Sequence, residues 1–263
     1  MIKFEISNPK NMNKEVYKTY NDIKLHLYIF KPENREPNNM LSVIVFFHGG
    51  GQDPSQFFPQ CEYFSERGMM AISAEYRQWV KPPVESVIDG KSAIIWIRNH
   101  ALKLGIDTKR IAAAGASAGG FVALCTTLIN GYESDTTDSS INSKPTALVL
   151  FNPVVDTVSN PKITYFFKKN PKDLSPMHHI KKGLPPMIIF HGTRDKIIPI
   201  KEIENFTIKV KKLGNVCELV SFERKGHGFF NFGAYKNKPY DETVRATDKF
   251  LSTLGFLKGE PII

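Results

Sequence analysis

Short apolar runs alternate with helix-length amphipathic segments along most of this chain. The run "LSVIVFFHGGG" at 41–51 is continuously apolar, as a buried strand is, and it ends in glycines. The segment 57–68 has helical spacing and is closed by Gly68, and 69–77 is again strand-like. Repeated alternation of this kind predicts an α/β protein with a mostly parallel sheet and helices on both of its faces.

The same rhythm continues to the end of the sequence. Further helices are predicted over 84–105, 117–130, 200–214 and 241–256, and further strands over 110–115, 146–155, 185–192 and 217–226. The polar segment 133–145 has the composition of a disordered or variable loop, and the pattern of 156–186 predicts no particular element.

The beginning of the chain follows a different pattern. Residues 15–32, "EVYKTYNDIKLHLYIFKP", alternate between polar and apolar side chains around Asn21 and Asp22. This is typical of an antiparallel hairpin at the edge of a sheet. We therefore expect an eight-stranded mixed sheet, and because no repeat or linker interrupts the pattern, a single domain over 1–263.

Composition narrows the class of protein. With 263 residues, 41% of them hydrophobic, the chain can bury a large core. The three cysteines lie far apart and have no metal-ligand spacing, so neither a disulfide framework nor a zinc site is predicted. No apolar run is long enough to span a bilayer, and the first residues lack a signal-peptide core. We expect a soluble protein, cytoplasmic as given, or secreted or periplasmic if a signal peptide has been removed.

The net charge of +9 raises the question of a polyanionic partner. The lysines are scattered as pairs, without interleaved aromatic residues, which is typical of a solvated surface. We expect no nucleic-acid partner and no membrane partner, whereas an anionic carbohydrate substrate stays open. The oligomeric state is not predicted.

The stretch "RIAAAGASAGGFVAL" at 110–124 places one serine among small residues. Gly115, Ser117 and Gly119 form a GxSxG pattern at the point where a predicted strand turns into a predicted helix. Such a turn holds a nucleophilic serine in a strained backbone above the sheet, and bulky neighbours would collide there. The pattern alone is weak, because small residues also form close-packing turns and phosphate cradles.

Three other stretches strengthen the interpretation. "HGGG" begins at His48 and ends a predicted strand, Asp195 lies in "HGTRDKIIP", and His227 lies in "GHGFF". Each follows the carboxyl end of a predicted strand, where open α/β sheets carry their sites. The chain order of serine, aspartate and histidine is that of the α/β-hydrolases.

On these motifs the sequence resembles the α/β-hydrolase superfamily from about residue 15 to residue 255. It is similar in particular to carboxylesterases related to hormone-sensitive lipase and to bacterial acetyl-xylan and feruloyl-type esterases. Two features differ from the lipase-like members. Ala116 stands where an acidic residue is usual, and only a hairpin precedes HGGG where those members have a helical cap. We therefore expect little or no cap domain and favour the acetyl or feruloyl esterase type.

The resemblance implies the α/β-hydrolase fold and a catalytic triad. Ser117 would be the nucleophile, His227 its base, and Asp195 the acid that orients the histidine. The backbone amides of Gly49, Gly50 and Ala118 would form the oxyanion hole.

We also expect Gly51, Gln52 and Phe229 to contact substrate, since they flank the HGGG and His227 loops. Core packing is an equal alternative for the aromatic residues of these loops. The chemistry requires no metal and no cofactor.

Other motifs favour structural roles. His48 is expected to orient the oxyanion loop, and "MHHI" at 177–180 to lie at a pocket edge rather than to bind metal. Cys125 is expected in the core, and Arg77 and Asp89 are candidates for an ion pair that anchors a loop.

The predicted activity is hydrolysis of short-chain acyl esters through an acyl-enzyme, with deacetylation of carbohydrate esters as a finer hypothesis. An amidase, such as an arylformamidase-like hydrolase, is an alternative, since such enzymes share HGGG and GxSxG. The other alternative is a non-catalytic binding module with a hydrolase fold. Such modules usually lack the serine or the histidine, and both are present here.

Overall fold

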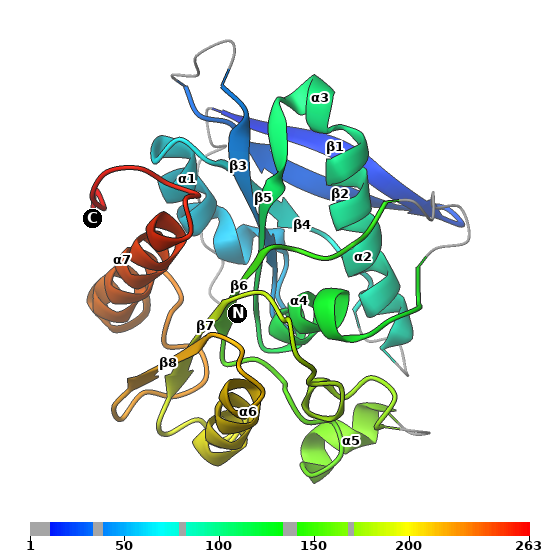
Figure 1. The fold of residues 1–263 in the computed structure, drawn as a ribbon, viewed down its shortest axis with the longest axis vertical. Coiled ribbons are helices and arrows are strands. Elements are labelled where there is room, and N and C mark those ends of the chain that lie inside the picture. The colour runs from blue at the N-terminus through cyan, green and yellow to red at the C-terminus, as the bar shows by residue number, and fades with distance from the viewer. Residues whose placement is uncertain (1–10, 34–38, 79–82, 134–140, 168–170) are drawn as a thin grey trace.

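One sheet organises the molecule, with strands in the order β1-β2-β4-β3-β5-β6-β7-β8 (Figure 1). The computed structural model describes residues 11–33, 39–78, 83–133, 141–167 and 171–263. The strands are β1 Met12–Tyr20, β2 Ile23–Phe30, β3 Leu41–Phe47, β4 Met70–Ala74, β5 Ile106–Ala116, β6 Ala147–Phe151, β7 Met187–Gly192 and β8 Cys217–Phe222. All pairs from β4 to β8 are parallel, which confirms the predicted α/β-hydrolase architecture.

The N-terminal hairpin makes the sheet mixed. β1 pairs antiparallel with β2, and β2 pairs antiparallel with β4. Asn21, at the turn between β1 and β2, has a φ of 50°, a left-handed conformation that asparagine adopts more readily than most residues. The predicted hairpin is confirmed. Within the described residues, no helix precedes β3.

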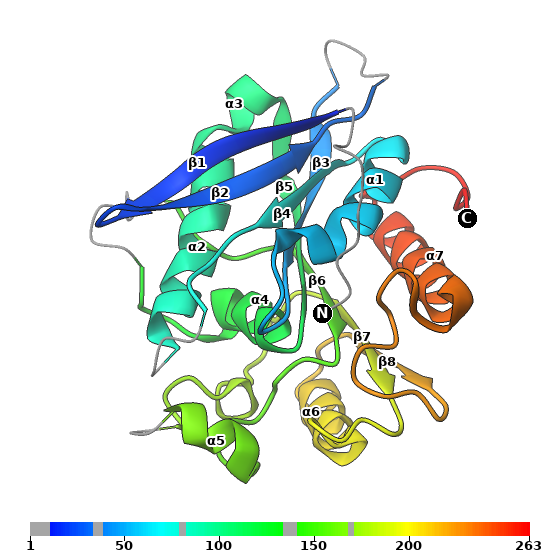
Figure 2. The same cartoon turned by 180° about the vertical axis from the view of Figure 1, so that it is seen from behind.

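Helices cover both faces of the sheet (Figures 1 and 2). The helices are α1 Phe58–Glu66, α2 Val84–Asn99, α3 Ala101–Leu104, α4 Ala118–Leu128, α5 Pro161–Phe167, α6 Ile200–Lys212 and α7 Lys238–Thr253. Side chains of β3 alternate between the faces: Val43 and Val45 belong to the core under α2, α4 and α6, whereas Ile44 and Phe46 belong to the core under α1 and α7. None of the described helices combines the length and apolar character that a membrane crossing needs.

The structure differs from the sequence prediction in two places. The segment predicted as one helix after Pro83, up to Gly105, contains two, since α2 ends before His100 and α3 follows until Gly105, whose φ of 66° ends the helix. The pattern of 156–186 predicted no element, yet α5 forms there. Part of the predicted loop 133–145, residues 134–140, lies outside the described residues.

Candidate active site

The site lies where the strand order changes direction. β3 pairs with β4 on one side and with β5 on the other, and at their carboxyl ends Phe47 is the register partner of Gly115. The two chain segments that follow, HGGG and the Ser117 turn, therefore leave the sheet side by side. In open α/β sheets ligands bind in the crevice at such a switch point.

Ser117 occupies a strained turn between β5 and α4. Its φ of 52° and ψ of −114° are unfavourable for a residue with a Cβ. Neighbouring backbone fixes this conformation. The Ser117 amide donates to the carbonyl of Phe151 at 3.0 Å, and the Ser117 carbonyl accepts from the amides of Phe121 at 3.0 Å and Val154 at 3.2 Å. Ser117 is thus held by contacts with the end of β6 and with the segment that follows it, as well as by its own helix.

The glycines around Ser117 are required by space. A Cβ at Gly115 would overlap the backbone of Gly119, and a Cβ at Gly119 would overlap the carbonyl oxygens of Phe47 and His48. These are backbone atoms of packed elements, which cannot move aside as a flexible side chain can. The close approach of α4 to the end of β3 therefore depends on glycine at 119.

Asp195 and His227 are directly paired. Nδ1 of His227 donates to Oδ2 of Asp195 at 2.6 Å. The other oxygen, Oδ1, accepts from the amides of Ile197 at 2.8 Å and Ile198 at 3.0 Å. With its Nδ1 proton directed to the carboxylate, neutral His227 has Nε2 unprotonated, the form that a general base requires.

The Asp195 carboxyl stays ionised at neutral pH. Burial alone would raise the pKa of Asp195. The hydrogen bond from His227, the electrostatic interaction with that ring and the amides of Ile198 and Ile197 outweigh burial, so the pKa of Asp195 lies below its ordinary value.

The loops that carry Asp195 and His227 are tied to each other and to β6. The amide of Arg194 donates to the carbonyl of Lys225 at 2.9 Å. Asn152, which follows the Phe151 that accepts from Ser117, places its Nδ2 3.2 Å from both ring nitrogens of His227. Phe151 ends β6 and Asn152 follows it, so one dipeptide contacts both the Ser117 backbone and the His227 ring. The three residues predicted for the triad therefore lie at the same end of the sheet.

The amides predicted for the oxyanion hole do not all face the same way. The Gly49 amide donates to Oε1 of Gln56 at 2.7 Å, and the Gly51 amide donates to Oε1 of Gln78 at 2.8 Å. Within the described part of the chain, the amides of Gly50 and Ala118 donate to no protein acceptor, and both residues line the cavity beside Ser117. The geometry therefore leaves Gly50 and Ala118 available to an oxyanion, and it engages Gly49 elsewhere.

His48 lies beneath this loop. Its ring is buried and stacks on Tyr76 with centroids 4.5 Å apart, and its Nδ1 donates to the carbonyl of Gly49 at 3.1 Å. The Tyr76 hydroxyl in turn donates to the carbonyl of His48 at 2.7 Å. Burial lowers the pKa of His48 to about 4, so the ring is neutral at physiological pH. This position agrees with the predicted role in orienting the loop.

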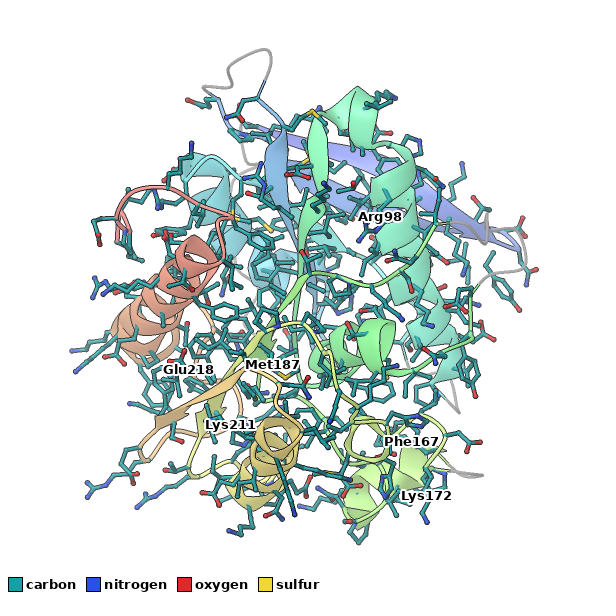
Figure 3. All side chains as sticks on the ribbon, in the orientation of Figure 1. Arg98, Phe167, Lys172, Met187, Lys211 and Glu218 are labelled. Carbon is teal, nitrogen blue, oxygen red and sulfur yellow. The ribbon has the colours of Figure 1, made fainter. Side chains whose placement is uncertain are left out.

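The cavity in front of Ser117 has a volume of about 240 Å³ and is mainly apolar. Its lining residues are Gly50, Tyr76, Gln78, Pro83, Ser86, Ser117, Ala118, Phe121, Val154, Ile163, Phe166, Phe167 and Ile197. Phe167, at the end of α5, is labelled in Figure 3. Ser117 carries the one polar side chain of this lining that has no hydrogen-bond partner among the described residues.

The predicted substrate-contacting residues lie outside this lining. Gly51 and Gln52 are exposed and are held by the Gln78 side chain, whose Nε2 donates to the Gln52 carbonyl at 2.8 Å. Phe229 is fully buried in the core, where its ring packs against Phe222 and Phe230. Its neighbour His227 is in the site, but the turn after His227 directs Phe229 under the sheet.

Several residues of the site have no signal in the sequence. Asn152 is buried at the end of a strand with a φ of 36°, and only the Asn-Pro dipeptide marks a turn there. Gln56 and Gln78 accept hydrogen bonds from the amides of the HGGG loop through their side-chain oxygens. The sequence does not predict where this loop lies relative to the two glutamines. The apolar lining from α5 lies in a segment for which no element was predicted.

The remaining candidates have structural contacts. In "MHHI", His178 contacts Oγ of Ser175 at 2.8 Å, and His179 contacts the Lys172 carbonyl at 3.1 Å. Across the described ranges, no three His, Cys, Asp or Glu side chains are grouped to hold a metal ion. Cys125 is fully buried, which raises the pKa of its thiol.

The predicted pair of Arg77 and Asp89 is confirmed. Nε of Arg77 donates to Oδ2 of Asp89 at 2.7 Å, and Nη2 donates to Oδ1 at 2.8 Å. This two-point contact anchors the segment between β4 and α2.

Comparison with solved structures shows a close overall match. Thermogutta terrifontis esterase 2 phosphoramylated by tabun is 45% identical to this chain, with a TM-score of 0.90, and the alignment covers 95% of this chain and 97% of that one. The same esterase with propionate bound is 44% identical, with a TM-score of 0.89 over 95% of this chain and 97% of the other. It has also been captured with butyrate bound.

Comparison with curated proteins finds esterases whose sequence identity to this chain is lower. Esterase LipC of Mycobacterium tuberculosis is 23% identical over 222 residues, which are 73% of this chain and 54% of LipC. Isoprenylcysteine alpha-carbonyl methylesterase ICMEL1 of Arabidopsis thaliana, a probable assignment, is 25% identical over 63% of this chain and 40% of its own length. The chain spans about half the length of the curated relatives it matches.

The family model that matches is BD-FAE, over residues 27–170. This range runs from β2 through the HGGG loop and the Ser117 turn to α5. Together with the sheet order and the pairing of Asp195 with His227, the match identifies the fold and the class of protein. The chain belongs to the BD-FAE family of α/β-hydrolase esterases.

Proposed function

We propose that this chain is a serine carboxylesterase that hydrolyses short-chain acyl esters, with Ser117 as nucleophile, His227 as base and Asp195 as the orienting acid. The observation that carries the proposal is a Ser117 hydroxyl that has no hydrogen-bond partner among the described residues, in a strained turn at the wall of an apolar cavity. The His227 and Asp195 pair stands at the same end of the sheet.

Each residue has one chemical task in the first half-reaction. Ser117 Oγ attacks the ester carbonyl carbon, and its proton passes to Nε2 of His227. Asp195 holds the ring in this tautomer and stabilises the imidazolium that forms. The carbonyl oxygen becomes an oxyanion that accepts from the amides of Gly50 and Ala118. A fixed donor of this kind lowers the barrier by about 3 to 4 kcal/mol.

The first half-reaction ends when the tetrahedral intermediate breaks the bond between the carbonyl carbon and the alcohol oxygen, and the alcohol leaves with the proton from His227. The second half-reaction repeats the same steps on the acyl-enzyme with water. Water then attacks the acyl-enzyme, and His227 takes its proton and returns it to Ser117 Oγ as the acid departs. Thermogutta terrifontis esterase 2 is phosphonylated by sarin and binds propionate and butyrate, which supports an activated nucleophile and short acyl groups here as well.

The cavity favours an apolar acyl group over a sugar. Tyr76, Gln78 and Ser86 contribute its other polar side chains, and each already has a backbone partner. A carbohydrate alcohol, as in the finer hypothesis of deacetylation, would have to lie outside this cavity. That hypothesis has only the sequence resemblance in its support.

The test is hydrolysis of p-nitrophenyl esters from acetyl to dodecanoyl, with acetylated xylan and a formyl amide alongside. We expect the highest kcat/KM between acetyl and butyryl, and a loss of at least about a thousandfold in Ser117→Ala with the fold retained. Acetate release from xylan would support the carbohydrate hypothesis. Activity on the amide alone would favour an amidase, and silence on every substrate would overturn the proposal.

A further inference from the structure

The HGGG loop contains three consecutive glycines, and within the described residues only the middle one, Gly50, has an amide without a protein acceptor. The amides on either side of Gly50 are each engaged by a glutamine side chain, Gln56 at Gly49 and Gln78 at Gly51. A glycine-rich backbone has many accessible conformations, so its glycines alone do not determine which amide faces the cavity. The two glutamines supply that constraint.

Both glutamines make a second contact. Nε2 of Gln78 donates to the nearby Gln52 carbonyl, whereas Nε2 of Gln56 donates to Oδ1 of Asn231 at 2.9 Å, across 175 positions of sequence. Asn231 closes the turn that begins at His227, since its amide donates to the carbonyl of Gly228 at 3.4 Å. One side chain thus spans from the oxyanion loop to the loop of the catalytic base.

The position of Gln56 allows both contacts at once. It lies in the 3₁₀ turn Pro54–Phe57, which begins at Asp53, whose side chain accepts from the amide of Ser55 at 2.8 Å. Phe57 of the same turn is fully buried and stacks on Phe46 of β3 at 4.8 Å. The base of Gln56 is therefore fixed by the core, and its amide group is held from both sides.

We propose that Gln56 is a positioning residue that sets Gly50 as the oxyanion donor and fixes its place relative to the His227 loop. This inference rests on the proposed function, because it assumes that Gly50 meets the oxyanion. Removing the Gln56 amide frees the loop without removing any group that touches substrate. The effect should therefore fall on kcat, because the oxyanion exists only after attack, and KM should change little.

The first experiment compares steady-state kinetics of Gln56→Met with the parent protein on p-nitrophenyl butyrate. Methionine keeps the length and volume of glutamine but has no amide. We expect kcat to fall about ten- to a hundredfold, with KM within about threefold, since complete loss of an oxyanion donor costs about a hundred- to a thousandfold.

Gln60→Met is the matched control. Gln60 lies one turn further along, on α1, and it is buried, with no hydrogen-bond partner for either side-chain amide atom in the part of the chain that the structure describes. We expect its kcat to stay within about twofold of the parent. An equal fall in both variants would overturn the proposal, because it would show a general cost of altering this helix.

The contact with Asn231 is tested separately. Asn231→Leu removes the acceptor and should lower kcat about three- to tenfold, whereas Asn231→Asp keeps an acceptor and should restore most of the activity. The double variant of Gln56→Met and Asn231→Leu should be no slower than Gln56→Met alone, since both act through one contact. Additive losses would overturn the coupling. The comparison of Asn231→Leu with Asn231→Asp stays informative even if Gln56→Met does not fold, and equal kcat values in these two variants would overturn the proposal.

A thionoester substrate distinguishes positioning from a general structural defect. Sulfur accepts hydrogen bonds from amides weakly, so loss of a fixed amide should slow the oxygen ester more than the thionoester. We expect the ratio of kcat for the oxygen ester to kcat for the thionoester to fall in Gln56→Met and to stay at the parent value in Gln60→Met. An unchanged ratio in Gln56→Met would overturn the proposal.

The outcome also separates this inference from the proposed function. If the parent protein hydrolyses no ester, or if Ser117→Ala keeps its activity, the proposed function fails and the inference fails with it. If the parent is active, Ser117→Ala is inactive and Gln56→Met matches the parent, only the inference fails.

Discussion

The two walls of the cavity are built on different principles. One wall consists of backbone from the HGGG loop and the Ser117 turn, where Gly49, Gly51 and Ser117 all have amides with fixed partners. The other wall consists of apolar side chains, including Ile163 and Phe167 of α5. Steric exclusion and hydrogen bonds determine the shape of the backbone wall. The volumes of the side chains determine the shape of the apolar wall.

This difference predicts different responses to substitution. At the backbone wall, one added methyl group meets carbonyl oxygens that cannot move, so a small change should be severe. At the apolar wall, a change of volume alters the space for an acyl chain and leaves the reacting atoms in place. Chemistry and chain-length selectivity should therefore be separable by mutation.

The largest effect is expected at Gly119. In Gly119→Ala the added Cβ would overlap the carbonyl oxygens of Phe47 and His48, which forces α4 away from β3. We expect a loss of more than about 4 kcal/mol in the free energy of unfolding, measured by urea denaturation. Gly226→Ala is the control, because a Cβ there meets no atom within 4 Å, and it should change stability by less than about 1 kcal/mol. Equal stabilities would contradict this account of the backbone wall.

An intermediate effect is expected from pH, through His48 under the same wall. The pKa of His48 is lowered to about 4 in the folded protein, whereas an unfolded histidine has a pKa of about 6.5. Between these values the unfolded state binds the extra proton, so stability falls as the pH is lowered through this window. The contribution at full titration is on the order of 3 kcal/mol.

His48→Gln should show a flatter dependence of the unfolding free energy on pH between about 6.5 and 4. Lowering the pH also removes stability from Asp195, whose depressed pKa gives the same sign, so the difference between the two proteins is the quantity to compare. Parallel curves would contradict the assignment of a neutral, buried His48.

The smallest effect is expected at the apolar wall. Ile163→Ala enlarges the cavity and should raise kcat/KM for hexanoyl relative to acetyl esters by about tenfold, whereas Ile163→Phe should lower the same ratio. Ile208→Ala, on the exposed side of α6, is the control and should leave the ratio unchanged. If both substitutions at Ile163 lower kcat equally for all chain lengths, the two walls are not separable.

The sequence predicts the backbone wall better than the apolar wall. Gly115, Ser117 and Gly119 act through local backbone geometry, which a short motif specifies. Asp195 and His227 follow predicted strands, so the topology of a parallel sheet brings them together. The assignment of the whole chain to one domain stays a prediction.

The residues that were not predicted depend on packing between distant segments. Val154, Ile163 and Ile197 share one cavity only because the chain after β6 folds back beside the loop after β7. Gln56 prevents the Gly49 amide from facing the cavity, a contact that no local pattern encodes. The position of Phe229 could not be predicted either, because closeness to His227 in the sequence does not determine on which side of the turn the ring lies.

The most direct test of the central claim is to locate the group that an organophosphate modifies. After incubation with paraoxon, intact-mass and peptide mass spectrometry should show one diethylphosphoryl group per chain, on Ser117. Its formation should parallel the loss of esterase activity, and Ser117→Ala should remain unlabelled. Complete inactivation with the label on another residue, or with no label on Ser117, would contradict the claim that the strained serine between β5 and α4 is the nucleophile.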